Sequence, residues 1–216
     1  MKGIFVCIEG NDGSGKTTQV GLLKEALWKK GIDTSVYSYP THDSRYGRII
    51  RDEFLAGKVE LSVEEQFLLY LLDMQADKKR ILADLSAGKV VITDRYFIST
   101  IAYQSAGKFD YEKAKTVEEL MGLPRPDVIF YIDIPVLVAF ERKMKQKGKT
   151  DRFEGARGYL TKVGEVYEKL YADSYGSRSW IKIDGLKSIG KIHTIVLEGV
   201  ISMAEKNKLK SNEVVA

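Results

Sequence analysis

The segment Gly10–Thr17 carries residue types whose spacing suits phosphate binding. Its sequence, GNDGSGKT, follows an apolar run and precedes a segment with helical periodicity. The glycines allow backbone shapes in which successive N–H groups turn inward around a phosphate at a helix N-terminus. Lys16 adds a charge for the β- and γ-phosphates, and the Thr17 hydroxyl is suited to Mg²⁺. The alternative is a glycine-rich turn that merely joins a strand to a helix.

Both the GxxxxGK[ST] spacing and the strand–helix context are satisfied, so we predict that the chain binds a nucleoside triphosphate. The residues expected to hold it are Gly10, Asn11, Asp12, Gly13, Ser14, Gly15, Lys16, Thr17 and Thr18.

An aspartate and an arginine stand together at the end of another apolar run. Val90–Thr93 leads directly into Asp94 and Arg95, and ligands of open α/β sheets gather at the carboxyl ends of strands. In a triphosphate enzyme the carboxylate can hold Mg²⁺ or its water, and the guanidinium can bridge phosphates. A structural ion pair is the alternative, but beside a phosphate loop we favour a functional pair.

Apolar strands alternate with helical patterns along the chain. This alternation predicts an α/β protein of the P-loop NTPase type, with a five-stranded parallel sheet wrapped by helices in a single domain, residues 1–216. The expected strands are Ile4–Ile8, Thr34–Ser38, Val90–Thr93, Val128–Ile132 and Trp180–Ile183. The expected helical segments are Leu22–Lys30, Val63–Leu85, Val136–Lys145, Tyr159–Tyr171 and Ile189–Lys206. Gly31 and Gly88 are expected to end helices, and residues 207–216 to fray.

Composition limits the other classes of function. The 34 Lys and Arg against 30 Asp and Glu give a small basic excess spread along the chain, which does not call for nucleic acid. The one cysteine, Cys7, falls in the first strand, where a buried inert thiol is expected. We find no signal peptide and no run of membrane-spanning length, so we expect a cytoplasmic enzyme without a membrane partner.

Four segments of the chain resemble thymidylate kinases. They are IEGNDGSGKTTQ in the phosphate loop, DRYFISTIAYQ from Asp94, PDVIFYIDI from Pro126 and DRFE from Asp151, and they occur in this order. DRY followed by AYQ at this interval is far more specific than the phosphate loop. The resemblance implies a nucleoside monophosphate kinase that uses ATP and Mg²⁺ to convert dTMP into dTDP for dTTP synthesis. It also implies a homodimer.

The resemblance also implies roles for particular residues. Arg95 would contact the acceptor phosphate and the phosphoryl group in flight, and Arg51 would help to hold the acceptor. Asp12 would lie near the acceptor sugar and the reaction centre, as a catalytic residue. Tyr70 would stack on thymine, Thr100 and Gln104 would hydrogen-bond the base, and Tyr103 would disfavour a ribose 2′-hydroxyl. Arg142 would pack on adenine. Each has a simpler alternative, because Tyr70 and Tyr103 could be core aromatics and Arg51 a solvated helix charge.

An acceptor-binding helical region, residues 43–85, and a short lid, residues 143–154, complete the expected fold. The lid must shield the phosphoryl group from water. This segment is basic, and Gly13 stands where some thymidylate kinases carry an arginine, so the resemblance places the catalytic cation in the lid. Lys147, Lys149 and Arg152 are the candidates; otherwise the charge run is a solvated face.

The chain departs from the family pattern at Met74. Thymidylate kinases commonly have an arginine four residues after the stacking aromatic, which hydrogen-bonds the thymine carbonyl. Methionine packs on a flat ring but cannot donate a hydrogen bond. Base recognition should therefore depend on Gln104 and Thr100, and we expect activity to extend to dUMP.

Three other classes of function remain as alternatives. A P-loop kinase for another nucleotide or a nucleoside is the first; a nucleoside acceptor would require a carboxylate base, for which Glu9 or Asp94 could serve. A nucleotide-dependent switch is the second, although the third strand is not followed by the DxxG of a GTPase switch and no NKxD motif occurs. A nucleic-acid ATPase is the third, and the scattered basic residues argue against it.

Overall fold

The computed structural model describes the backbone of residues 3–147 and 153–213, and side chains outside 143–156 and 206–216. The strands are β1 (Ile4–Glu9), β2 (Thr34–Ser38), β3 (Val90–Asp94), β4 (Val128–Asp133) and β5 (Trp180–Asp184). The helices are α1 (Lys16–Lys29), α2 (Arg45–Arg48), the π-helix η1 (Ile49–Phe54), α3 (Val63–Ser86), α4 (Phe97–Ala106), α5 (Tyr111–Met121), α6 (Val136–Lys147), α7 (Phe153–Ala172) and α8 (Ile189–Glu213).

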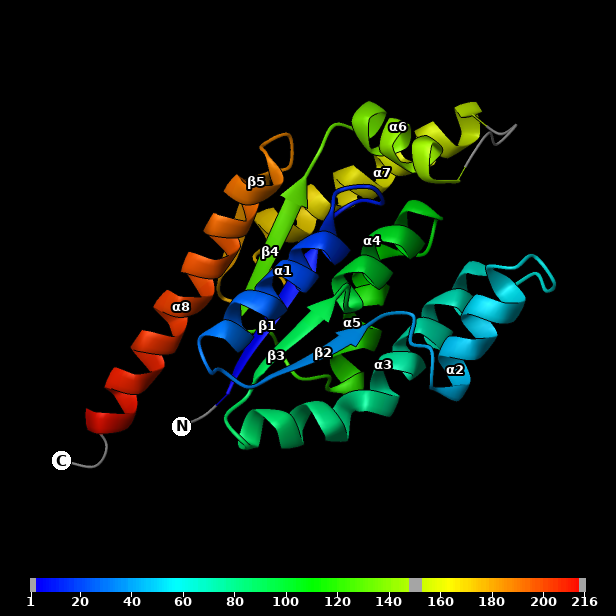
Figure 1. Ribbon diagram of the computed structural model, residues 1–216. Coiled ribbons are helices and arrows are strands. Elements are labelled where there is room, and N and C mark those ends of the chain that lie inside the picture. The colour runs from blue at the N-terminus through cyan, green and yellow to red at the C-terminus, as the bar shows by residue number, and fades with distance from the viewer. Residues whose placement is uncertain (1–2, 148–152, 214–216) are drawn as a thin grey trace.

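The strands form one parallel sheet in the order β2-β3-β1-β4-β5. Each connection between consecutive strands contains at least one helix, because parallel neighbours require a crossover (Figure 1). β1 lies at the centre, so the loop that follows it opens at the middle of the carboxyl edge of the sheet. The predicted five-stranded parallel sheet wrapped by helices is confirmed.

Alternating side chains of β1 supply two apolar cores. Ile4, Val6 and Ile8 pack with residues of α1 and α8 on one face of the sheet. Phe5 and Cys7 pack with residues of α3, α4 and α7 on the other. The central strands are buried on both faces, which explains their continuous apolar sequences. Cys7 is a fully buried free thiol whose pKa is raised by burial, in agreement with the inert cysteine that we expected.

The strands agree with the sequence-based bounds to within one residue, whereas several helices differ. α1 begins at Lys16, directly after the glycine loop, and α7 begins at Phe153. α8 continues to Glu213 and so includes most of residues 207–216, for which fraying stays a prediction. α4 and α5 lie outside the helical segments expected above, whereas η1 falls within the expected helical region at residues 43–85. Most residues of α4 are buried, so it lacks the polar stripe by which periodicity reveals a helix.

The expected acceptor-binding region, residues 43–85, contacts the sheet through α3, which packs against β3. Ser62 and Glu65 form a capping box at the start of this helix. Further along α3, the buried Asp73 carboxylate accepts hydrogen bonds from the backbone N–H and hydroxyl of Thr41, at 2.8 and 2.6 Å, and from the Ser44 hydroxyl. These bonds fix the segment between β2 and α2 against α3.

In the described ranges, no helix has the length and apolar character needed to cross a bilayer.

Candidate active site

The loop between β1 and α1 has the backbone shape that phosphate binding requires. Gly10, Gly13 and Gly15 have φ values of 143°, 83° and 95°, a region that side chains rarely adopt. A Cβ on Gly10 would lie 2.4 Å from the carbonyl oxygen of Ile132, and one on Gly13 would lie 2.6 Å from that of Ala139. Close packing against the chain around β4 and α6 therefore demands glycine at Gly10 and Gly13.

Lys16, the first residue of α1, turns its ammonium group back onto the loop. Its Nζ donates hydrogen bonds to the carbonyl oxygens of Gly10 and Asn11 over 3.0 and 2.9 Å. Burial and the nearby Arg95 lower the pKa of Lys16 to about 7. The fold therefore holds a nearly buried amine where an anionic group would raise that pKa again.

Thr17 and Asp94 meet at the edge of this loop. The Thr17 hydroxyl donates to the Asp94 carboxylate over 2.6 Å, which brings together the two residues that we predicted to hold a metal. No group of three or more His, Cys, Asp or Glu side chains suited to a metal occurs in the described part of the chain. One hydroxyl and one carboxylate still fit Mg²⁺, which keeps several waters and is completed by substrate phosphates.

Arg95 follows the end of β3 in an unusual backbone conformation, with φ of 67°. Its guanidinium donates to the Ser99 hydroxyl over 3.1 Å, pairs with the Asp12 carboxylate, and lies 5.3 Å from the centre of the Tyr103 ring. A non-glycine residue in the left-handed region is held there by its surroundings and is typical of functional sites. The structure thus brings Arg95 to the mouth of the phosphate loop.

The buried carboxylate of Glu9 lies behind Arg95. It accepts hydrogen bonds from the backbone N–H groups of Tyr96 and Ser99, at 2.8 and 3.2 Å, and from the hydroxyls of Ser99 and Tyr167, at 2.6 and 2.9 Å. Burial raises the pKa of Glu9, while these bonds and Arg95 oppose the shift. A carboxylate enclosed in this way supports α4 and Arg95 and has no room to act as a base on a substrate.

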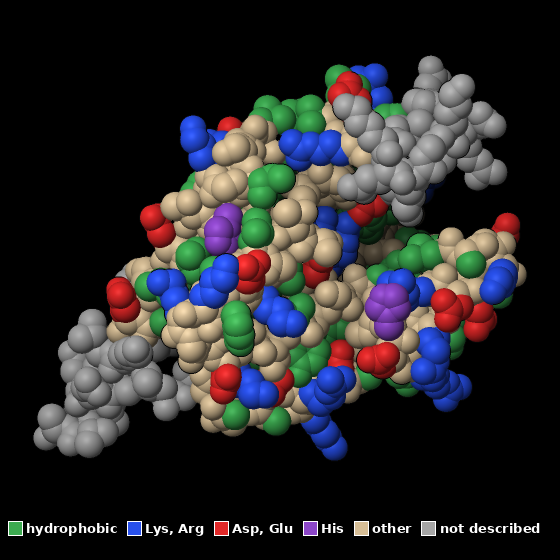
Figure 2. Space-filling model, viewed as in Figure 1, with side chains coloured by type: hydrophobic (Ala, Val, Ile, Leu, Met, Phe, Trp, Pro, Cys, Tyr) green, Lys and Arg blue, Asp and Glu red, His purple; other side chains and the backbone are tan. Residues whose placement is uncertain are grey.

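Two cavities adjoin at Asp12 and Arg95. The larger, about 870 Å³, is lined by the phosphate loop, His42, Arg51, Asp94, Arg142 and the segment from Gly185 to Ile192. The smaller, about 370 Å³, lies between α3 and α4. Asp12, Tyr39, Pro40 and Arg95 line both. The surface is hollowed between the part of the molecule that carries α2 and the remainder (Figure 2).

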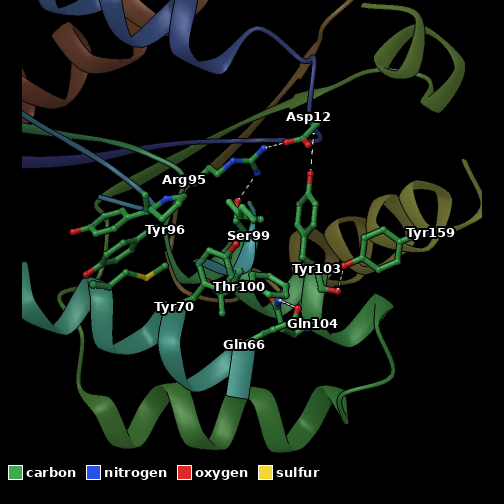
Figure 3. A pocket seen from close by; sticks show the side chains of 15 residues that line it. Asp12, Gln66, Tyr70, Arg95, Tyr96, Ser99, Thr100, Tyr103, Gln104 and Tyr159 are labelled. Atoms are coloured by element: carbon green, nitrogen blue, oxygen red, sulfur yellow. Dashed lines mark hydrogen bonds and ion pairs between the residues drawn. The ribbon is translucent and has the colours of Figure 1, made fainter. Parts of the chain in front are cut away.

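The smaller cavity collects most of the predicted acceptor residues, and we therefore call it the acceptor cavity (Figure 3). Tyr70 and Met74 come from α3; Thr100, Tyr103 and Gln104 come from α4; Asp12 and Arg95 close one end. The Tyr103 hydroxyl also accepts the backbone N–H of Asp12 over 3.2 Å. Arg51 is the exception, because it lines the larger cavity only.

Tyr70 and Tyr103 are therefore cavity walls and not simply core aromatics. Burial raises the pKa of Tyr70 to about 12, so its hydroxyl is neutral at physiological pH. An uncharged aromatic side chain in the wall of a cavity between two helices is suited to packing against a flat ring.

Arg142 joins the two sides of the larger cavity. Its guanidinium donates to the carbonyl oxygen of Gly13 over 3.4 Å and to that of Gly185 over 3.2 Å. The lid predicted at residues 143–154 and its cations Lys147, Lys149 and Arg152 have side chains outside the described residues, so their roles stay predictions.

Sequence reasoning missed several residues of the site. Gln66 and Tyr159 line the acceptor cavity, Ser99 supports Arg95, and Gly185 contributes a carbonyl beside Arg142. Gln66 lies four residues before Tyr70 and eight before Met74 on α3, so the helical spacing could have identified it. Gly185 follows β5 and has no local signal, because only the sheet order brings it to β4.

The site has the parts of a P-loop nucleotide kinase. They are a glycine loop at the centre of a parallel sheet, a Thr–Asp pair and two adjoining cavities of nucleotide size. The family model for thymidylate kinase matches residues 8–196. The chain belongs to the thymidylate kinase family.

Individual relatives extend over nearly the whole chain. It is 36% identical over 198 residues to a thymidylate kinase of Leptospira interrogans, covering 91% of this chain and 93% of the relative. It is 38% identical over 202 residues to a probable thymidylate kinase of Pyrococcus horikoshii, covering 91% and 95%. It is 37% identical over 205 residues to a thymidylate kinase of Caldanaerobacter subterraneus, covering 93% and 96%. The family resemblance drawn from the four sequence segments is confirmed.

Proposed function

We propose that this chain transfers the γ-phosphoryl group of ATP to dTMP, giving ADP and dTDP. The observation that carries the proposal is the junction of the two cavities, where Asp12 and Arg95 line both. A donor with its triphosphate on the glycine loop and an acceptor between α3 and α4 would meet there. Family membership supplies the identity of the acceptor base and of the donor.

The chemistry requires positioning and charge more than proton transfer. A phosphate monoester is already ionised near neutral pH, so no general base is needed. Lys16 and Arg95 can give up their present partners, carbonyl oxygens and the Asp12 carboxylate, for phosphate oxygens. The planar fork of Arg95 would bridge the acceptor phosphate and the moving phosphoryl group.

The alternative of a nucleoside kinase lacks a free base in the candidates that we named. Glu9 is enclosed by five hydrogen bonds within the protein, one of them from the Cys7 thiol, and Asp94 accepts the Thr17 hydroxyl. We assign Asp94 with Thr17 to hold Mg²⁺, which when bound would neutralise charge on the phosphates. The Asp94 carboxylate would then be unsuited to accepting a proton from a nucleoside hydroxyl.

We assign roles to the remaining residues from their positions in the two cavities and from the family resemblance. Tyr70 would stack on the base, Thr100 and Gln104 would hydrogen-bond its edge, and Tyr103 would crowd a ribose 2′-hydroxyl. Arg51, from the larger cavity, would reach the acceptor phosphate only near the junction. Arg142, beside Gly185, would pack on adenine. The lid cations, a homodimer and a cytoplasmic location stay predictions that rest on the resemblance.

A coupled kinase assay tests the proposal. With ATP and Mg²⁺, we expect dTMP to be the best acceptor among dTMP, dUMP, dCMP, dGMP, dAMP and thymidine. Arg95→Lys keeps the charge but loses the planar fork, so kcat for dTMP should fall by about 10²-fold, the scale for losing one donor aimed at transition-state charge. Preference for thymidine over every monophosphate, or full activity of Arg95→Lys, would contradict the proposal.

A further inference from the structure

The end of the acceptor cavity away from the phosphate loop carries a pair of amide side chains. Figure 3 places Asp12 and Arg95 at one end and Gln66 and Gln104 at the other. Nε2 of Gln104, on α4, donates a hydrogen bond to Oε1 of Gln66, on α3, over 3.4 Å. This contact joins the two helices where the base of an acceptor nucleotide would lie.

The orientation of the Gln66 amide is fixed from its other side. Nε2 of Gln66 donates to the carbonyl oxygen of Leu61 over 2.8 Å. Because that nitrogen is the donor end of the amide, Oε1 must face Gln104. Rotation of the Gln66 amide by half a turn would place Oε1 against the Leu61 carbonyl, which is also an acceptor.

The two helices are held firmly at this level. The rings of Phe67, on α3, and Phe109, three residues after the end of α4, stack with centres 4.5 Å apart, and Phe67 is fully buried. A Cβ on Gly107, at the end of α4, would lie 3.2 Å from Cγ2 of Val63 on α3. Gln66 is therefore presented to Gln104 by tightly packed elements and not by a loop.

These contacts leave the oxygen of the Gln104 amide for a ligand. One N–H of its Nε2 is engaged by Gln66, and within the described residues no hydrogen bond reaches its Oε1. The side chain thus offers an acceptor to the cavity. Thymine and uracil carry an N–H group at ring position 3, whereas cytosine carries a lone pair there.

We propose that Gln66 is a specificity-determining positioning residue, which locks the Gln104 amide so that it accepts a hydrogen bond from N3–H of thymine or uracil and rejects cytosine. The inference rests on the proposed function. To suit cytosine, Gln104 would have to rotate and place its Oε1 against Oε1 of Gln66, leaving two acceptors facing each other. Since Met74 supplies no donor in this cavity, the amide pair carries more of the base selection.

Substitution of Gln66 tests the lock through ratios of kcat/KM. Gln66→Leu removes it, so the preference for dTMP over dCMP should fall by about fivefold, the scale of one neutral hydrogen bond. The preference for dTMP over dUMP should not change, because both bases present N3–H. Gln66→Glu offers acceptors from either carboxylate oxygen, so it should keep the rejection of dCMP although it loses the bond to Leu61.

Gln75→Leu is the matched control, the same change on the same helix outside the cavity lining, and should leave every ratio unchanged. An unchanged dTMP to dCMP ratio in Gln66→Leu would overturn the inference, as would an equal loss in Gln66→Leu and Gln66→Glu. If Gln66→Leu does not fold, Gln66→Met makes the same test. Absence of dTMP turnover in the unmodified protein would instead overturn the proposed function, which separates the two failures.

Discussion

Lys16 shows how one residue can couple nucleotide binding to pH. Its ammonium group is nearly buried and bonded to two loop carbonyls, and burial, with the charge of Arg95, brings its pKa to about 7. A bound triphosphate would favour the charged form and raise that pKa. At pH 8 the free protein therefore holds mostly neutral lysine, and binding should take up about one proton.

We expect ATP affinity to fall as pH rises from about 7 toward the ordinary lysine pKa of about 10.4, because the proton taken up becomes scarcer. Calorimetry at pH 8 in buffers of different ionisation enthalpy, with Mg²⁺ in excess so that the phosphates do not titrate, measures this proton directly. Lys16→Ala should abolish the uptake. Equal uptake in the variant would assign the proton to another group.

Because Met74 has no hydrogen-bond donor, the discrimination between nucleotide bases depends on few contacts. It lines the acceptor cavity together with Tyr70, one turn away on α3, and offers no hydrogen bond to a base. The distinction between dTMP and dUMP then rests on the thymine methyl, which a pocket values at only about 1–3 kcal/mol. We expect measurable phosphorylation of dUMP, and a change in acceptor preference in Met74→Arg. Complete rejection of dUMP together with an unaffected Met74→Arg variant would show that another residue reads the base.

At the scale of elements, the carboxyl ends of β1 and β3 determine where α4 and α7 lie. The N-cap of α4, Tyr96, makes no side-chain capping bond, and the Glu9 carboxylate takes over by accepting the N–H groups of Tyr96 and Ser99. Glu9 also holds the Tyr167 hydroxyl of α7. Because α4 carries Thr100, Tyr103 and Gln104, this carboxylate supports the acceptor cavity from behind.

Glu9→Gln should therefore weaken both the fold and the site. Glutamine replaces one carboxylate oxygen, which accepts hydrogen bonds, by an NH₂ group that would face other donors. The free energy of unfolding in urea should therefore fall by about 1–3 kcal/mol, and KM for dTMP should rise. Glu118→Gln is the control, since Glu118 is equally buried but bonds Arg125 and Tyr175 instead. It should lose stability without a change in KM. Equal KM values for dTMP in both variants would contradict the role of Glu9 in positioning α4.

Some features of the fold and the site could be predicted from the sequence, whereas others depend on how the elements pack. Strand positions and the phosphate loop could be predicted because continuous apolar runs and glycine spacing are local signals. The enclosure of Glu9 and the contact of Arg142 with Gly185 depend on sheet order, which places the end of β1 beside that of β3 and the end of β4 beside that of β5. Helical spacing could have placed Gln66 on the same face as Tyr70. Its contact with Gln104 could not be predicted, because it depends on the packing of α4 beside α3.

At the scale of the whole molecule, the two cavities meet, and this continuity is open to a binding test. Since Asp12 and Arg95 line both, adenosine and thymidine joined through a polyphosphate linker should fill the larger and the smaller cavity at once. The second nucleoside then binds at an effective concentration in the millimolar range or above. Calorimetry should give a linked compound that binds at least about 10²-fold more tightly than ATP or dTMP alone.

The same compound should raise the midpoint of thermal unfolding above that reached with ATP and dTMP together, because a ligand that binds only the folded state stabilises it in proportion to its affinity. A single cooperative transition is expected, as for one domain. Arg95→Ala should reduce the gain from linkage more than it reduces the binding of ATP, since Arg95 stands at the junction. If linkage brings no gain in affinity, the cavities do not accept donor and acceptor end to end, and transfer between them as proposed would be wrong.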